Sequence, residues 1–295
     1  MPSAHPTEAA RARRVARIKA ALACPRCRGA LTYSAAEARC SACATAYPIR
    51  RERIYFVDVP TRNDDLDRVK AWLKRTLGQA YYTVGIQIFA PTFPLDFARV
   101  VTRHVDPSTA LVVDAGSGNN RLHPDTISID IFDYDAVDLV CTLESLPFRP
   151  DALDAIVSRS VLEHLRDPAA VVKEFHRCTR PGGLGIHLIP FLFPAHASPV
   201  DYHRFTPDGH DILFEAWERV SRTNPTGPVT VALLHFIEVL STMLGFGVAR
   251  LRSIAYLLLC GLTFPIKFLD AVFINRPAFM ASAASVLSVV RKSSE

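Results

Sequence analysis

The chain has 295 residues, of which 49% are hydrophobic and 21% charged, so it is long enough for one large domain and a small one. This composition excludes an intrinsically disordered chain. The net charge of +5 is modest, and the arginines are spread along the sequence, so nucleic acid is not an expected partner.

Residues 1–20 are rich in arginine and predict a basic helix that extends into solvent as an arm. They contain no apolar stretch of the length that a secretory signal needs. We therefore expect the chain in the cytoplasm, where its seven cysteines remain thiols or bind metal.

Residues 21–60 contain two CxxC pairs. Cys24 and Cys27 form the first pair, Cys40 and Cys43 form the second, and 12 residues separate the pairs. Each pair fits a tight knuckle with both sulfurs on one side, so four thiolates can close a tetrahedral zinc site with no open position. Such a site stabilises a small fold and performs no chemistry. The spacing predicts a zinc ribbon with one structural Zn²⁺.

The text from LACPRCRGAL to CSACATAYPIRRERIYFV resembles the small zinc-ribbon proteins that partner tRNA and release-factor methyltransferases. In that family the ribbon is a separate chain that activates or stabilises the enzyme. The resemblance implies a built-in helper here, with a structural or docking role.

Beyond the ribbon we predict a helical connector, an α/β core, an apolar helical insertion, and a last strand with the tail. They cover residues 61–105, 106–222, 223–280 and 281–295, in that order. Within the core, strand patterns alternate with a helical pattern, which predicts a parallel sheet with crossovers. The strand segments are ALVVDAGSG, TISIDI, DALDAIVSRS and LGIHLIPFL, and the helix is PAAVVKEFHRC.

The first of these strands ends in a loop of small residues. Gly116 and Gly118 let the backbone approach a ligand without a clash from Cβ. The next strand ends at Asp130, where an acidic side chain can accept both hydroxyls of a ribose. A glycine loop alone is a weak signal, but CTLESLPF, LDAIVSRSVLEHLRDP and RPGG follow in order.

Together these motifs resemble the class I methyltransferases that use S-adenosylmethionine and act on small molecules, quinones and glycans. The resemblance covers about residues 110–222 and implies a Rossmann-like sheet. It also implies a set of cofactor contacts. Asp114, Gly116 and Gly118 would hold the methionine end, Asp130 the ribose and Ile131 the adenine, while Glu144, Ser145 and Leu146 would line the adenine edge and Ser158 would lie near the sulfonium.

Two features depart from the family pattern. Thr142 stands where the family often has Asp, and only seven residues, 119–125, separate Gly118 from Thr126. Seven extended residues reach about 24 Å and a five-residue strand is about 17 Å long, so the chain can return without a crossover helix. We expect residues 63–105 or the apolar C-terminal segment to cover the sheet face exposed by this shortened first crossover.

The segment PFLFPAHASPVDYHRFTPDG, residues 190–209, lies in this fold over the methyl group of the cofactor. Two interpretations stay open. Either the segment is a proline-rich connector braced by a pair between Asp201 and Arg204, or it is the acceptor pocket. In the pocket, His196 would be the base, Asp201 would orient it, and Tyr202 and Arg204 would hold the acceptor. Related methyltransferases carry a similar H…P-x-D-[YF]-x-R-[FY]-T run.

We expect a methyl transfer to a small-molecule, lipid or glycan-type acceptor. An RNA or protein methyltransferase guided by the ribbon is the first alternative, but the N-P-P-Y or D-P-P-Y motif of enzymes that methylate amide or base nitrogens is absent from AIVSRSVLEH. The second alternative is a non-enzymatic binding module with a degenerate pocket, supported by Thr142 and the missing helix.

Two apolar stretches, residues 231–249 and 254–274, are long enough to consider as membrane spans. Polar residues interrupt both, and the cleanest run, residues 254–265, has only 12 residues. That length favours a buried or interfacial helix over a spanning one. Peripheral contact with a membrane surface through residues 231–274, with Arg250 and Arg252 at the head groups, remains open beside burial in the domain or in a homo-oligomer interface.

Overall fold

The structure is a computed structural model that describes residues 8–60, 72, 75–78, 85, 90–195 and 200–294. One mixed sheet of 11 strands runs through it, in the order β1-β2-β3-β4-β7-β6-β5-β8-β9-β11-β10. The strands are β1 Leu31–Tyr33, β2 Glu37–Cys40, β3 Ala46–Arg50, β4 Arg53–Tyr55, β5 Val112–Ala115, β6 Ile127–Asp130, β7 Leu139–Val140, β8 Leu153–Arg159, β9 Thr179–Pro190, β10 Glu218–Thr226 and β11 Ser285–Arg291.

The α/β fold expected for the core is observed. Strands β7, β6, β5, β8 and β9 are parallel neighbours, and β11 lies antiparallel between β9 and β10. The carboxyl ends of the parallel strands therefore share one edge of the sheet. The C-terminal strand expected from ASVLSVVRK is β11.

Helices pack on both faces of this sheet. On one face, α4 (Phe97–Thr102) buries Phe97 and Val101 against Val112 and Val157. On the other face lies α5 (Pro168–Cys178), which buries Phe175 among other apolar side chains. Its sequence explains its start, because the Asp167 side chain accepts a hydrogen bond from Ala170 N at 2.9 Å and Pro168 takes the first helical position.

Residues 116–126, between β5 and β6, form turns without a helix, as the short crossover predicts. Arg121, within this connection, donates hydrogen bonds to Thr126 O at 2.8 Å and to Asp138 Oδ2 at 3.1 Å. Asp138 is fully buried and also accepts from Ser128 N at 3.0 Å. The chain therefore covers the short crossover with a buried polar cluster.

Two alternatives were expected for what covers this face, and one of them is observed. Helix α4, inside residues 63–105, covers β5 and β8, whereas the apolar C-terminal segment packs elsewhere. Most of the predicted connector, residues 61–71, 73–74, 79–84 and 86–89, lies outside the described residues.

The N-terminal segment was expected to be a solvated arm, and this is wrong. Helix α1 (Glu8–Ile18) lies along the amino-terminal edge of the sheet, with Arg11 and Arg14 only 5% and 6% exposed. Arg14 donates to both Asp138 carboxylate oxygens, and Arg17 donates to Ala110 O at 2.7 Å just before β5. The arginines therefore hold the helix to the sheet.

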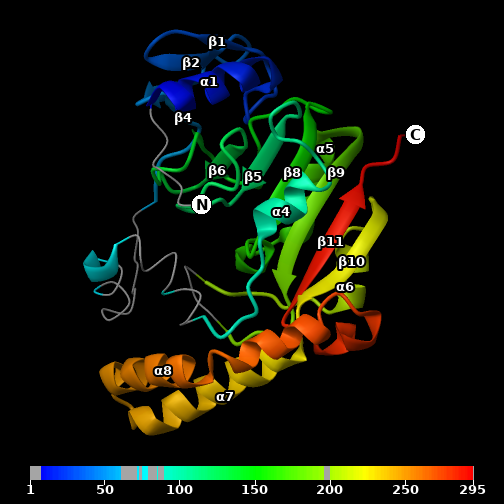
Figure 1. Cartoon of the computed structure of the whole chain (residues 1–295). Coiled ribbons are helices and arrows are strands. Elements are labelled where there is room, and N and C mark those ends of the chain that lie inside the picture. The colour runs from blue at the N-terminus through cyan, green and yellow to red at the C-terminus, as the bar shows by residue number, and fades with distance from the viewer. Residues whose placement is uncertain are drawn as a thin grey trace.

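The cysteine-rich unit continues the main sheet instead of forming a detached domain. Strand β4 pairs in parallel with β7, with Ile54 opposite Leu139 and Tyr55 opposite Val140. Its buried residues belong to the same apolar core as β5, β6 and α5. At the other end of the molecule, α7 (Pro228–Gly245) and α8 (Ala249–Thr263) form a helical hairpin (Figure 1). The remaining elements in the described part of the chain are α6 (Pro207–Leu213) and the short 3-10 helices at Lys19–Ala21, Leu162–His164, Ile266–Val272 and Pro277–Ser282.

Candidate functional site

The glycine loop after β5 has a backbone that other residues adopt with strain. Gly116 has a φ of +68°, and a Cβ there would lie 2.6 Å from Val161 Cγ2. Gly118 has a φ of +58°, and its Cβ would meet nothing within 4 Å. The backbone of the loop therefore favours glycine at both positions, and the space beside Gly118 is open. A site where a ligand closely approaches the backbone requires both features.

Asp130 ends β6 beside this loop and holds it. Its Oδ2 accepts a hydrogen bond from Gly118 N at 2.9 Å, and its Oδ1 accepts one from Phe132 N at 3.0 Å. A carboxylate has about four lone-pair sites, so it can accept hydrogen bonds from several donors at once. The carboxylate is thus fixed in place at the edge where the sequence predicts a ribose.

Asp114, in the middle of this region, is almost completely buried at 7% exposure. Burial raises the pKa of its carboxyl to about 7, an effect that the charges of Arg159 and Arg121 partly oppose. A carboxyl that is half protonated near neutral pH responds strongly to a cation placed beside it.

The three residues predicted at the adenine edge differ in their contacts. Glu144 is exposed, as is Ile131 at 37%. Ser145 Oγ instead donates to Pro25 O at 2.7 Å, inside the first CxxC pair. Leu146 is buried, and its N donates to Glu174 Oε1 at 2.8 Å. The LPF segment therefore touches the cysteine-rich unit, a role that the sequence did not indicate.

Ser158 was predicted to lie near the sulfonium. Its main chain is opposite Ala115, directly before the glycine loop. Its side chain is fully buried, and Oγ lies 2.8 Å from His187 Nδ1. His187 is stacked between Phe175 and Phe214, and burial lowers its pKa to about 3. The Ser158 hydroxyl is therefore committed to the core, and only its backbone lies beside the loop.

In the segment 190–209, the pair expected by the bracing interpretation is present. Arg204 bonds to both Asp201 carboxylate oxygens and donates to Phe193 O and Pro194 O, each at 3.1 Å. Tyr202 is 42% exposed and held by its N–H, which donates to Glu163 O at 2.8 Å. His196 lies outside the described residues, so its predicted role as the base stays a prediction.

Sequence reasoning missed Glu163, whose main chain anchors this segment. It belongs to the LEH motif and is fully buried, and burial raises the pKa of its carboxyl to about 7. His164 Nδ1 lies 2.6 Å from Val200 O. Both Glu163 and His164 of the LEH turn therefore contact the segment 190–209. The motif marked the position, but burial of an acid is a tertiary property that spacing does not reveal.

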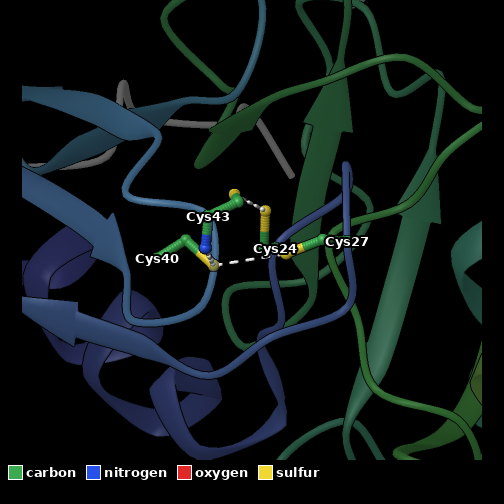
Figure 2. Close-up of side chains that lie close together, drawn as sticks. All are labelled: Cys24, Cys27, Cys40 and Cys43. Carbon is green, nitrogen blue, oxygen red and sulfur yellow. Dashed lines mark hydrogen bonds between the residues drawn. The ribbon is translucent and has the colours of Figure 1, made fainter.

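The four cysteines lie together at the tips of two knuckles, as Figure 2 shows. Their sulfurs all lie within 4.8 Å of one another, a set of four thiolates suited to one tetrahedral ion. Gly29 fits this packing, because a Cβ there would lie 2.8 Å from Ala42 Cβ and 3.0 Å from Cys40 Sγ. The donor set therefore fits zinc.

The cysteine-rich unit is joined by polar contacts to the segment that follows β7. Arg28, directly after Cys27, donates to Leu146 O at 2.8 Å and to Glu174 Oε1 at 3.0 Å. Ala23 N donates to Pro147 O at 3.0 Å. A change in the knuckle can thus reach the segment that follows β7.

Comparisons with known proteins relate part of the chain to methyltransferases. Residues 90–186 match the family model described as a methyltransferase domain. An uncharacterized methyltransferase of Schizosaccharomyces pombe (strain 972 / ATCC 24843) is 33% identical over 87 residues, which are 29% of this chain and 29% of that relative. The match therefore covers less than a third of the relative's length.

Two solved structures match this chain with low similarity. One is phosphoethanolamine N-methyltransferase 2 of Haemonchus contortus in complex with S-adenosyl-L-methionine. It is 15% identical, with a TM-score of 0.46, and the match covers 76% of this chain and 59% of that one. The other is 1,6-didemethyltoxoflavin-N1-methyltransferase of Burkholderia thailandensis. It is 15% identical, with a TM-score of 0.43, and the match covers 89% of this chain and 99% of that one.

Proposed function

We propose that the whole chain, whose residues 90–186 form an S-adenosylmethionine-dependent methyltransferase domain, transfers a methyl group to a small-molecule, lipid or glycan-type acceptor. The observation that carries the proposal is the glycine loop, with its open tip at Gly118 and its hydrogen bond to Asp130. We place this reaction in the cytoplasm.

Each residue of this edge has a task in the proposal. Asp130, fixed by its bond to Gly118 N, accepts the ribose hydroxyls, and the Gly116–Gly118 loop admits the methionine end beside Asp114. Ile131 and Glu144, both exposed, border the adenine. The bound cofactor supplies a methyl group that its sulfonium makes electrophilic, so the protein has to align the acceptor and exclude water.

The acceptor would bind under the segment 190–209, and we propose His196 as the group that takes its proton. Tyr202, which is 42% exposed, would offer its hydroxyl to the acceptor. Arg204 and Asp201 form an ion pair that braces the segment, so their contribution is to hold its shape. Bracing and an acceptor pocket are compatible, because a pocket needs a rigid wall.

The cysteine-rich unit is proposed to be a structural zinc ribbon that supports the cofactor loop. Its contacts with Ser145 and Leu146 supply the physical connection. The ion would hold the two knuckles together and do no chemistry, because four thiolates leave no open position. This makes the ribbon a permanent helper of the methyltransferase domain.

Calorimetric titration with S-adenosylhomocysteine tests whether the site binds the cofactor product. Binding is expected with one site per chain, and its absence would favour a non-enzymatic module. Incubation with radiolabelled cofactor and fractionated cell extract then identifies the acceptor class. Label in RNA or protein, instead of lipid, glycan or small molecules, would favour an enzyme guided by the ribbon.

The acceptor site is tested by His196→Ala, with binding and turnover measured separately. Retained cofactor binding with lost turnover supports the proposed base. Turnover at the parent rate would leave the segment only its bracing role.

A further inference from the structure

The α7–α8 hairpin leaves much apolar surface uncovered. Its helices pack on each other through Leu233, Ile237 and Cys260. Other apolar side chains form a row on each helix, with members three, four or seven residues apart, as one helical face requires. The rows include Phe236, Val239 and Met243 on α7 and Leu251, Leu258 and Leu262 on α8, which are between 48% and 78% exposed.

The apolar surface continues beyond the two rows. Phe246, at the turn of the hairpin, is 84% exposed, and Phe268 and Leu269, in the 3-10 helix that follows α8, are 47% and 58% exposed. Single exposed apolar residues are common, but a contiguous set marks an interaction surface. Helix α7 by itself has the length and composition of a membrane span, with a mean hydropathy of 1.5. Only 33% of this helix is buried. A core helix of a soluble domain would be mostly covered.

The charges of residues 228–282 indicate what kind of partner this surface fits. The segment is fully described and contains two acidic residues, both of which have partners. Asp270 is buried and accepts hydrogen bonds from Val229 N and Thr230 N, and Glu238 forms an ion pair with Arg252. Arg250 and Arg276 are exposed. An apolar surface that carries exposed cations complements the head groups of anionic lipids.

The hairpin also begins at a defined edge of the sheet. Strand β10 is parallel to β9, because both lie antiparallel to β11, so α7 starts at the carboxyl edge. This is the edge that carries the glycine loop after β5. Phe93 N donates to Thr230 Oγ1 at 2.9 Å, and Lys267 Nζ donates to Ala90 O at 2.7 Å, which fastens the hairpin base to the core.

We propose that the hairpin binds the surface of an anionic lipid bilayer, with its apolar rows at the acyl boundary and Arg250 and Arg276 among the head groups. At a rise of about 1.5 Å per residue, α7 and α8 are roughly 27 Å and 22 Å long, enough to lie within the interface. Bound in this way, the hairpin holds the carboxyl edge near the bilayer. Resting on the proposed function, the acceptor class is then a membrane amphiphile.

Flotation with vesicles tests the surface without requiring turnover. The full-length protein should float with vesicles of phosphatidylcholine and phosphatidylglycerol, and less with phosphatidylcholine alone. Protein that stays at the bottom of the gradient with both vesicle types overturns the proposal. Titration of the same sample with S-adenosylhomocysteine distinguishes this failure from a failure of the proposed function.

Matched variants locate the contact. Leu262→Asp should abolish flotation, whereas Ile212→Asp on α6 should not, although the two side chains are exposed to similar extents, 78% and 73%. Arg250→Gln should weaken partition into anionic vesicles about fivefold and leave neutral vesicles unaffected. Circular dichroism checks that each variant is folded. A Leu262→Asp variant that floats like the parent, or that changes a dimer into a monomer without vesicles, contradicts a lipid partner.

Discussion

The cysteine-rich unit, the proposed zinc ribbon, and the α7–α8 hairpin are both additions to the same sheet, yet they are attached in opposite ways. The ribbon extends the sheet through pairing of β4 with β7, and its apolar residues belong to the central core. The hairpin is joined at its base, and its own buried cluster contains only Leu233, Ile237 and Cys260. The cysteine-rich unit is therefore part of the same folding unit as the sheet, whereas the hairpin leaves much of its apolar surface exposed.

This difference predicts where mutations act. Changes in the ribbon should alter the stability of the whole sheet and the affinity for the cofactor. Changes on the outer faces of the hairpin should alter neither and act on partner binding alone. Variants matched between the two regions can break or sharpen this division.

The largest effect should follow loss of the metal site. Cys24→Ser, or removal of zinc with a chelator, should destabilise ribbon and sheet together, because structural zinc contributes on the order of 10 kcal/mol in small metal-dependent domains. Cys260→Ser, at an equally buried thiol in the hairpin, should lower stability by only about 1–2 kcal/mol and leave the zinc content unchanged. Thermal unfolding and elemental analysis measure both. If the ribbon melts while the sheet keeps its melting temperature, the ribbon is not part of the same folding unit. If the purified protein contains no zinc, the four cysteines do not form a zinc site.

A second contrast concerns ion pairs. Asp138→Ala would leave Arg14 and Arg121 buried without their carboxylate, at a cost of about 3–5 kcal/mol. Glu238→Ala removes the partner of Arg252, whose side chain is half-exposed in the hairpin, and should cost at most about 1 kcal/mol. Denaturant unfolding of the two variants gives the difference, and equal losses would show that the hairpin is as integral as the ribbon.

The same division explains what the sequence could reveal. Strands β5, β6, β8, β9 and β11, helix α5 and the glycine loop were predictable because their signals are local: apolar runs, an Asp167-Pro168 helix start and glycines after a strand. Counting seven residues after Gly118 was enough to predict the short crossover. Each of these inferences depends on neighbours in the chain.

What the sequence did not reveal has the opposite cause. Arg14 looked like a solvent residue because its partner, Asp138, lies 124 positions away. The place of Ser145 and Leu146 at the adenine edge stays a prediction, but the resemblance did not reveal that Pro25 and Arg28 contact them from the cysteine-rich unit. A motif match aligns positions within one family and is silent about a neighbour that this chain adds.

Next in size is the effect of Asp130 on cofactor binding. Asp130→Ala removes the acceptor proposed for the ribose and the bond to Gly118 N, so affinity for S-adenosylhomocysteine should fall by about 2–3 kcal/mol. Asp133→Ala, at a half-exposed acid three residues later, is the control and should bind like the parent. Calorimetry measures both, and an unchanged affinity for Asp130→Ala would mean that the ribose is held elsewhere.

The pH dependence of the same affinity tests Asp114. With a pKa of about 7, its carboxyl is largely neutral at pH 6, whereas the proposed place beside the cofactor's ammonium group favours the charged form. Affinity should therefore rise with pH, by at most about tenfold per unit, and level off above pH 7. The folding stability of the free protein should change with pH in the opposite direction. Because the pKa of Asp114 is raised in the folded state, stability falls as pH rises from about 4 to 7. Asp114→Asn should remove both trends, and a parent affinity that is flat with pH would place the ammonium group elsewhere.

The smallest effect tests the division most directly. Arg28 donates to Leu146 O and to Glu174, and its side chain is 37% exposed, so Arg28→Ala should cost only about 1 kcal/mol of folding stability.

Because Leu146 lies in the segment between β7 and β8, loss of this bond should also loosen the adenine edge and weaken S-adenosylhomocysteine binding severalfold. Leu258→Ser, at a 69% exposed site of the hairpin, should change neither stability nor affinity. If Arg28→Ala binds the cofactor product like the parent, the ribbon supports the fold without reaching the site. If Leu258→Ser weakens binding, the hairpin is coupled to the carboxyl edge, and the two additions differ less than their attachments indicate.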